Sequence, residues 1–228
     1  MNPKDNIRRI DSHFPEDDIL QEAAQIIRCG GVVVFPTTGL YGLGADAAHP
    51  AAIEKVFAVK RRSPDKPILI LVPDRNAIAN LVQEIPIAAE RAMAAFWPGK
   101  LTLVFKAAAG ILPALTAGTG HIGIRLPVHP VAQALVRAVG RPITATSANL
   151  SGQTGCACIA DLDPAVAGAV DLILDAGGLE GGAGSTILDV TCDPPVILRE
   201  GAVSKSLILS CLSCVSKEGK AAVDSGSP

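Results

Sequence analysis

Three adjacent cations, Lys60, Arg61 and Arg62, are the residues whose types and spacing point most directly to chemistry. They follow a segment with apolar residues at helical spacing, so they could simply cap the negative pole of a helix. Three cations exceed what capping needs, however, and an arginine fork beside a lysine point charge is a common pairing for a polyphosphate. The spacing leaves two interpretations open, a phosphate-binding cluster or a solvated basic turn.

A second polar group, Ser147-Ala148-Asn149, directly follows a short expected strand at residues 142–146. Serine and asparagine are common in turns, where they bond to the local backbone. Alternatively, these side chains and the free N–H groups beside them could point into the same cleft as Lys60 and Arg62. The motif is too short to decide between these roles by itself.

Two more arginines interrupt or end apolar stretches. Arg125 lies within residues 122–126, and Arg199 closes the stretch that begins at residue 196. A charged side chain is rarely buried without a partner, so each arginine should reach solvent or meet an anion. Ser185 follows a glycine-rich loop that could wrap a phosphate or carboxylate, or could be only a flexible turn.

The familiar motifs of covalent and zinc catalysis are missing from the chain. The sequence contains no G-x-S-x-G, no H-E-x-x-H and no Walker G-x-x-x-x-G-K-[ST]. His49, His121 and His129 do not fall at metal-ligand spacing. The available side chains can neutralise charge and position a ligand. No metal bound by protein side chains is expected.

Four of the six cysteines form two close pairs, Cys156 with Cys158 and Cys211 with Cys214. Together they could supply four thiolates to zinc. The favoured interpretation is a set of reduced, mostly buried thiols, because free cysteine packs as a small hydrophobe and C-x-C is a loose metal motif.

The elements that must position these residues can be read from apolar periodicity. A strand at residues 32–35 is followed by a glycine-rich loop, a helix ending at Lys60, and a second apolar run at residues 68–72. That order places cations and free N–H groups at one end of a sheet, where an α/β protein holds an anion. Further helices are expected at 15–29, 74–82, 86–96, 130–139, 164–170 and 203–215, and further strands at 101–105, 122–126, 142–146, 172–174, 185–190 and 196–198.

Composition agrees with a single α/β domain built on an aliphatic sheet. Of the 228 residues 49% are hydrophobic but only 3% are aromatic, so Val, Ile, Leu and Ala must fill the core. The net charge of −2 gives no global attraction to nucleic acid. The chain shows no signal peptide and no membrane-length apolar run, so a cytoplasmic protein without a membrane partner is expected. Residues 217–228 are typical of a disordered tail.

Taken together, the motifs resemble the YrdC family of threonylcarbamoyl-adenylate synthases. The resemblance covers roughly residues 23–204 and rests on several ordered blocks, which are far more specific together than singly. These blocks are FPTTGLYGLGADA (35–47), KRRSPDKPILIL (60–71), WPGKLTLVF (97–105), IGIRLPVHP (122–130) with TSANLSG (146–152), and GSTILDV (184–190) with ILREGAVS (197–204).

The resemblance implies a fold, a domain plan and a reaction. The fold would be a single-domain, open, twisted mixed sheet flanked by helices, with a concave basic groove. The catalytic domain would span residues 16–204, and residues 205–228 would form a C-terminal helix and tail. L-threonine and bicarbonate would form an N-carboxy amino acid that attacks the α-phosphorus of ATP, with Mg²⁺ accompanying the nucleotide. Threonylcarbamoyl-AMP and pyrophosphate would result.

The resemblance also implies site residues, carried over by motif. The K-x-R motif falls on Lys60 and Arg62, which are expected to be catalytic. Those expected at ATP are Lys60, Arg62, Lys66, Ser147, Asn149, Gly155 and Arg199. Those expected at threonine are Thr37, Gly39, Arg125, Ala145 and Ser185. Replacing Lys60 or Arg62 by alanine should sharply reduce pyrophosphate release and leave the fold intact, because each change removes a charge-assisted phosphate contact at a surface cleft.

Two departures from the family pattern bear on amino-acid recognition. The usual P-T-[DE]-T-x-Y-G is PTTGLYG here, at residues 36–42, so an acidic residue and a threonine-contacting hydroxyl are missing. Leu71 stands where longer members often have histidine. The chain resembles the short form, which passes its product to separate threonylcarbamoyl-transferase proteins that modify an adenosine beside the tRNA anticodon.

Two alternatives stay open. One is a non-catalytic RNA-binding module that uses the same basic groove on tRNA or ribosomal RNA, although the near-neutral charge and scarce aromatic residues speak against it. The other is a carbamoyl-transfer relative of the hydrogenase-maturation enzymes, whose acylphosphatase and zinc-finger segments do not occur in this sequence. Double-stranded RNA or tRNA is also a possible partner of the enzyme.

Overall fold

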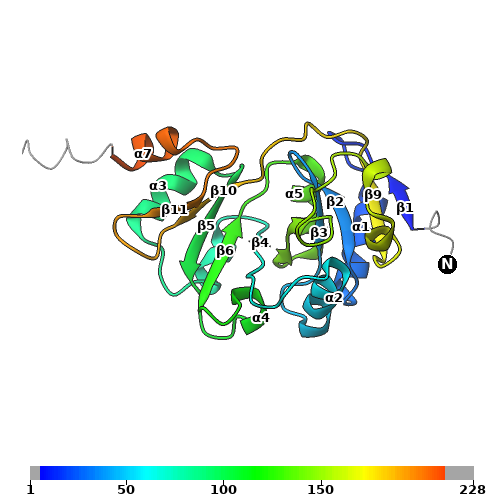
Figure 1. Cartoon of the computed structure of the whole chain (residues 1–228), viewed down its shortest axis with the longest axis horizontal. Helices are drawn as coiled ribbons and strands as arrows, with labels where there is room; N and C mark the ends of the chain where they lie inside the picture. Colours follow the sequence, from blue (N-terminus) through cyan, green and yellow to red (C-terminus); the bar gives the residue numbers. More distant parts are fainter. Residues whose placement is uncertain (1–5, 214–228) are drawn as a thin grey trace, which may run out of the picture.

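The computed structural model describes residues 6–213, which form a mixed α/β structure with two sheets (Figure 1). The five-stranded sheet contains, in spatial order, β1 (Ile7–Arg9), β9 (Leu172–Asp175), β2 (Val33–Pro36), β3 (Tyr41–Gly44) and β8 (Thr146–Ser147). The six-stranded sheet contains β11 (Val196–Arg199), β10 (Thr186–Asp189), β5 (Leu101–Lys106), β6 (His121–Arg125), β4 (Ile70–Leu71) and β7 (Ile143–Thr144). Both sheets mix parallel and antiparallel pairs.

Helices connect and cover these strands. They are α1 (Asp17–Arg28), α2 (Pro50–Lys60), α3 (Ile87–Phe96), α4 (Pro113–Thr116), α5 (Pro130–Val139), α6 (Pro164–Ala167) and α7 (Lys205–Ser213), with 3₁₀ turns η1 (Asn76–Asn80) and η2 (Ile159–Asp161). Proline begins several of them, where its missing N–H is no loss. The helix expected at 74–82 is shorter than predicted and is 3₁₀ rather than α.

The core is aliphatic, as composition predicts, and falls into two clusters. In one cluster α1 and α5 pack together on one face of the five-stranded sheet; its largest members include Ile27, Leu135 and Phe35. The other cluster runs from the opposite face of that sheet, through α2, into the six-stranded sheet and its covering helix α3. The two clusters bury both faces of β2, so the strand is apolar throughout.

The prediction of an α/β class with a mixed sheet is confirmed, but the strands form two sheets rather than one. The reason lies at residues 143–147. Ile143 and Thr144 pair with β4 in one sheet, whereas Thr146 and Ser147 pair with β3 in the other. Ala145 is the residue at which the chain passes between the sheets, and its N–H donates to the carbonyl of Leu69 at 2.9 Å.

Two strands were not predicted. The glycine-rich segment expected as a loop contains β3, whose antiparallel register pairs Gly42 with Phe35 and Gly44 with Val33. A side chain at Gly44 would collide with the Phe35 ring, since an added Cβ would lie 2.7 Å from it. Close packing between strands therefore requires glycine here, against its low strand propensity. The other unpredicted strand, β1, pairs with β9.

The C-terminal part of the described chain agrees with the expected helix. α7 packs against α3 and buries Ile208. The expected tail at 217–228 and Cys214 lie outside the described residues, and the boundary at residue 204 stays a prediction. Within residues 6–213, no helix has the length and apolar content needed to cross a bilayer.

Candidate anion-binding cleft

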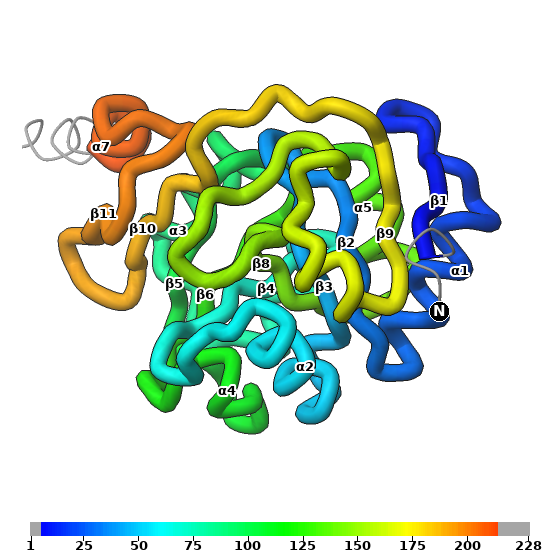
Figure 2. The backbone as a smooth tube through the Cα atoms, turned by 45° about the vertical axis from the view of Figure 1, so that its right-hand side comes forward, coloured from blue at the N-terminus to red at the C-terminus, as the bar shows by residue number. Residues whose placement is uncertain are grey.

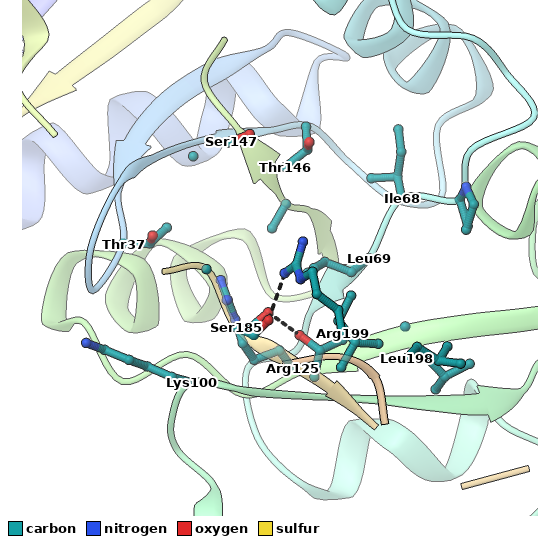
Figure 3. Close-up of a pocket in the computed structure, with 18 of the residues that line it drawn as sticks. Thr37, Ile68, Leu69, Lys100, Arg125, Thr146, Ser147, Ser185, Leu198 and Arg199 are labelled. Atoms are coloured by element: carbon teal, nitrogen blue, oxygen red, sulfur yellow. Dashed lines mark hydrogen bonds between the residues drawn. The ribbon is translucent and has the colours of Figure 1, made fainter. Parts of the chain in front are cut away.

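A cleft of about 610 Å³ lies between the two sheets and gathers residues from distant parts of the chain. Its walls come from the turn between β2 and β3, from β5, β6 and β10, and from the segment that joins the sheets. Figure 3 shows how the labelled residues from these elements are arranged around the cleft. Eight predicted site residues line it: Thr37, Gly39, Arg62, Arg125, Ala145, Ser147, Ser185 and Arg199. Lys60, Lys66, Asn149 and Gly155 do not line it directly.

The cleft is strongly cationic for a protein of net charge −2. The described lining residues include four cations, Arg62, Lys100, Arg125 and Arg199, and one carboxylate, Asp189. Opposing walls of low dielectric focus such a charge imbalance and raise the local concentration of anions. The arrangement therefore favours an anionic ligand.

Arg125 and Arg199 form the central cationic pair. Burial, and secondarily the nearby Arg199, lower the pKa of Arg125 to about 10, which still leaves it charged at neutral pH. Its buried Nε has no hydrogen-bond partner among the described residues. Arg199 donates from Nη2 to the carbonyl of Ser185 at 2.7 Å, and neither arginine has a carboxylate partner in residues 6–213. Two adjacent uncompensated cations are an expensive arrangement unless an anion joins them.

Ser185 is buried beside this pair, immediately before β10. Its hydroxyl lies 2.8 Å from the Thr102 hydroxyl on the neighbouring strand β5. The hydrogen bond between the two hydroxyls fixes the Ser185 side chain, and the Ser185 carbonyl accepts the bond from Arg199 (Figure 3). The predicted loop at 181–184 therefore leads into an ordered polar site.

Lys60 lies behind the cleft wall rather than in it. The side chain is 1% exposed, and its ammonium donates to the backbone carbonyls of Ser147 and Asn149, the latter at 2.8 Å. Burial, and secondarily the charge of Arg62, lower the pKa of Lys60 to about 8. An ammonium has three donors, so one remains for a ligand that reaches this point. The end of α2 and the turn after β8 thus converge, as the sequence predicts.

Arg62 faces the cleft and is partly exposed. Its guanidinium donates from Nη2 to the carbonyl of Pro67 at 2.9 Å, which holds it over the segment leading to β4. Burial lowers its pKa, and Asp65 acts in the opposite direction. Lys66 is exposed, and the structure brings its backbone carbonyl rather than its ammonium to Arg62. Of the basic cluster, Arg62 therefore faces the cleft and Lys60 lies behind the cleft wall.

The turn after β8 is well ordered. Asn149 donates from its amide to the carbonyls of Leu150 and Gln153, each at 2.7 Å, while its buried Oδ1 has no partner among the described residues. Gly155 lies against this turn, since an added Cβ would meet Leu40 at 3.0 Å and Ser147 at 3.3 Å. The Asn149 Oδ1 is therefore a buried acceptor without a partner, in the turn that follows the cleft residue Ser147.

The turn between β2 and β3 forms the opposite wall. Thr37 donates its hydroxyl to the carbonyl of Leu40 at 2.6 Å, so the side chain closes its own turn. Gly39 meets the loop after β9: its carbonyl accepts from the Gly181 N–H at 2.9 Å, and an added Cβ would lie 2.6 Å from the Gly181 oxygen. Gly39, which stands where the family pattern has threonine, therefore lies in close contact with the backbone of Gly181.

Sequence reasoning missed two charged residues of the cleft and the segment that crosses it. Lys100 and Asp189 both line the cleft. Lys100 precedes an apolar run, and Asp189 alternates with buried residues. In the sequence, both therefore look like ordinary polar residues at the ends of strands. Nothing in the sequence places residues 176–184, which connect β9 to β10, across the space between the sheets (Figure 2).

The cysteines do not form a metal site within residues 6–213. Cys156 points at the carbonyl of Ala148, and Cys211 points at the carbonyl of Arg91 on α3. No group of three or more His, Cys, Asp or Glu side chains capable of holding a metal occurs in this part of the chain. Cys156, Cys158 and Cys211 are free thiols.

The fold and the cleft place this chain among mixed α/β proteins that have a cation-lined cleft between two sheets. The model of the Sua5/YciO/YrdC family, described as "Telomere recombination", matches residues 25–201. The chain belongs to the Sua5/YciO/YrdC family, which confirms the resemblance seen in the sequence.

Named relatives extend this finding. The threonylcarbamoyl-AMP synthase of Bacillus subtilis is 41% identical over 198 residues, which cover 84% of this chain and 56% of that protein. The threonylcarbamoyl-AMP synthase of Stenotrophomonas maltophilia is 36% identical over 164 residues, covering 70% of this chain and 88% of that protein. A crystal structure of P. abyssi Sua5 complexed with L-threonine matches with a TM-score of 0.85 at 34% identity, covering 91% of this chain and 61% of that chain. The chain thus spans about half the length of its longer relatives.

Proposed function

We propose that this protein is an L-threonylcarbamoyladenylate synthase, which makes threonylcarbamoyl-AMP and pyrophosphate from L-threonine, bicarbonate and ATP. The observation that carries the proposal is the uncompensated pair Arg125 and Arg199 in a cleft that also receives Arg62, Ser147 and Ser185. The names of the similar proteins and the threonine complex of P. abyssi Sua5 support the same substrates.

The chemistry needs no protein nucleophile. The threonine amine adds to bicarbonate with loss of water, giving a carbamate with a new N–C bond. A carbamate oxygen then attacks the α-phosphorus of ATP, and the bond from that phosphorus to the bridging oxygen breaks to release pyrophosphate. ATP, bicarbonate, the carbamate, the adenylate and pyrophosphate are anions, and threonine brings a carboxylate. Positioned cations can therefore lower the barrier by holding these groups together and by stabilising charge on the leaving group.

In this proposal the two walls of the cleft have different tasks. Arg125 binds the threonine carboxylate, with Thr37, Gly39, Ala145 and Ser185 shaping the space around the amino acid. A bidentate guanidinium–carboxylate contact would satisfy the unpartnered Nε and neutralise one charge of the pair.

ATP occupies the other part of the cleft. Arg62 contacts its phosphates and Lys60 approaches them from behind the wall, both acting as catalytic cations. Ser147, Asn149 and Arg199 contribute the remaining polar contacts; the free Oδ1 of Asn149 is a suitable acceptor for a ribose hydroxyl or an exocyclic amine. Lys66 and Gly155 lie at the margin of this site, Lys66 as an exposed cation and Gly155 as a close backbone approach.

Mg²⁺ would enter with ATP as part of that substrate. Magnesium at polyphosphates uses one or two carboxylates in addition to phosphate oxygens and water. Asp189, the only carboxylate among the described residues that line the cleft, fits that requirement. Bound Mg²⁺ would neutralise charge on the phosphates.

The product would be passed in the cytoplasm to separate threonylcarbamoyl-transferase proteins that modify tRNA. Contact with tRNA or double-stranded RNA is a secondary expectation, since the cationic cleft is local and the protein as a whole is slightly acidic. An RNA-binding module without catalysis would show tRNA affinity that falls steeply with salt and does not depend on ATP.

The proposal is tested by incubating the protein with ATP, bicarbonate and L-threonine, and measuring pyrophosphate release together with products by mass spectrometry. Release that needs all three substrates, with the mass of threonylcarbamoyl-AMP, is expected. Parallel incubation with L-serine measures how strictly threonine is selected without a hydroxyl at position 39. A folded protein that forms no adenylate with any of these substrates, yet binds tRNA in a salt-sensitive way, would overturn the enzymatic assignment in favour of the RNA-binding one.

A further inference from the structure

Residues 176–184, here called the strap, connect β9 to β10 and so join the two sheets. In Figure 2 the strap is the yellow segment that runs between the labels β9 and β10. Its first residues are fixed by Tyr41, which is fully buried. The Tyr41 hydroxyl accepts from the Ala176 N–H at 3.0 Å and donates to the Gly177 carbonyl at 2.7 Å.

The middle of the strap is fixed on both sides of Glu180. Leu179 donates its N–H to the carbonyl of Ala157 at 2.8 Å, and Gly181 donates its N–H to the carbonyl of Gly39 at 2.9 Å. Because both neighbours are anchored, the backbone of Glu180 has a defined place beside Lys100. The Glu180 carboxylate lies 3.5 Å from the Lys100 ammonium.

The Lys100 backbone is held in place, whereas its ammonium can exchange the Glu180 carboxylate for another anion. Its carbonyl accepts from the Thr186 N–H at 3.1 Å, which ties it to the start of β10, and it lines the cleft. The ion pair with Glu180 is long, and the two side chains are 35% and 78% exposed. Exposed pairs of this kind contribute at most about 1 kcal/mol, so an anion of higher charge can displace the carboxylate.

Lys100 defines a cationic pole separate from the central arginines. In Figure 3 its side chain extends away from Arg125 and Arg199. The same cleft is lined by the turn at Thr38, Gly39 and Leu40, whose N–H groups donate no hydrogen bond to any described residue. Consecutive free backbone amides and a lysine are a combination that suits phosphate oxygens.

We propose that Lys100 binds the terminal phosphates of ATP and the pyrophosphate that leaves, and that Glu180 holds its ammonium when the cleft is empty. The inference rests on the proposed function in naming ATP as the ligand. The reason is charge distribution: the amino acid carboxylate is matched by Arg125, whereas a triphosphate carries its largest charge at the end farthest from the nucleoside. Lys100 is thus a binding residue for the leaving group, and Glu180 is its competitor.

The experiment compares variants of the full chain by calorimetric titration with three probes, ATP, pyrophosphate and AMP. Lys100→Gln should weaken ATP and pyrophosphate by about tenfold or more, because a charge-assisted contact is lost, and should leave AMP within about twofold. Lys100→Arg should restore most of the loss. Glu180→Gln should strengthen both probes severalfold at low salt, since the competing carboxylate is gone.

A matched control is Lys106→Gln, which removes a lysine from a similar exposed pair, with Glu84 at 3.7 Å, outside the cleft. It should change none of the three affinities. Equal weakening of AMP and ATP in Lys100→Gln, or no weakening of pyrophosphate, would overturn the assignment. A wild-type protein that binds pyrophosphate but not ATP would instead refute the proposed function. The pyrophosphate titrations of the variants would still test whether Lys100 binds that anion. Binding of none of the three probes would refute both.

Discussion

The ammonium of Lys60 donates a hydrogen bond to the backbone carbonyl of Asn149, 2.8 Å away, across 89 positions of sequence. A second bond reaches the carbonyl of Ser147. These two bonds tie the end of α2 to the turn after β8 and hold Lys60 behind the cleft wall, whereas Arg62, two residues later, faces the cleft. The two cations of one motif therefore differ in what their loss should do.

Arg62→Ala should reduce ATP-dependent pyrophosphate release by about tenfold or more and leave stability nearly unchanged. The guanidinium is partly exposed, and its bonds to the carbonyls of Pro67 and Lys66 are surface contacts. Pyrophosphate release and thermal unfolding measured on the same preparation check both parts. Full activity in this variant would remove Arg62 from the proposed phosphate site.

Lys60→Ala, by contrast, should destabilise the protein by about 2–4 kcal/mol, because it leaves a cavity and removes the donor to the Asn149 carbonyl; the Ser147 carbonyl keeps the Asn149 N–H at 3.0 Å. The expectation from sequence, that this change leaves the fold intact, is therefore revised. Urea unfolding measures the loss. Stability within about 0.5 kcal/mol of wild type would show that neighbouring groups replace the lysine.

The affinity for ATP should fall as pH rises through about 8. Burial lowers the pKa of Lys60 from 10.5 to about 8, so the ammonium loses its charge in this range. If ATP binds only the charged form, affinity falls by up to about tenfold per pH unit above that value. Lys60→Met should show no such fall. Wild-type affinity that stays constant to about pH 9 would contradict the assignment.

Stability should move in the opposite direction over the same range. The folded-state pKa of Lys60 lies below its unfolded value, so between about pH 8 and 10.5 the unfolded chain binds more protons at this residue. The contribution of Lys60 to the free energy of unfolding therefore rises with pH through that window. Urea titrations of wild type and Lys60→Met at a series of pH values isolate this contribution.

Arg125→Met should abolish threonine-dependent pyrophosphate release while leaving the free energy of unfolding unchanged or raising it by about 1 kcal/mol. The guanidinium is an uncompensated charge beside Arg199, and an apolar side chain of similar length removes that cost. Urea unfolding and threonine titration check the two halves. A loss of more than about 2 kcal/mol would indicate that Arg125 has a structural role instead.

Gly39→Ala should loosen the strap. The added Cβ would lie 2.6 Å from the Gly181 oxygen, so either the turn or the strap must move. Faster amide hydrogen exchange in residues 177–184 and a raised KM for ATP are expected. Gly178→Ala is the matched control, because its Cβ would have no atom within 4 Å. Identical exchange rates in the two variants would mean that the Gly39 contact does not hold the strap.

The α/β class, most helices and strands, and most of the residues that meet in the cleft could be predicted from the amino-acid sequence. Local physics suffices for these features: apolar periodicity marks α1 and α5, and β-branched runs mark β2 and β5. Arg125 and Arg199 could be found because a charge in an apolar strand is anomalous wherever the strand lies. The basic cluster after α2 also appears where its sequence places it.

Features that depend on residues distant in the chain could not be predicted in this way. β3 is a strand because β2 and β8 flank it, although its glycines predict a loop. Lys60 is buried because the turn after β8 supplies carbonyls for its ammonium. Lys100 faces the cleft and meets Glu180 because the strap crosses between two sheets. These outcomes are set by pairings between residues far apart in the chain, which periodicity along one segment does not contain.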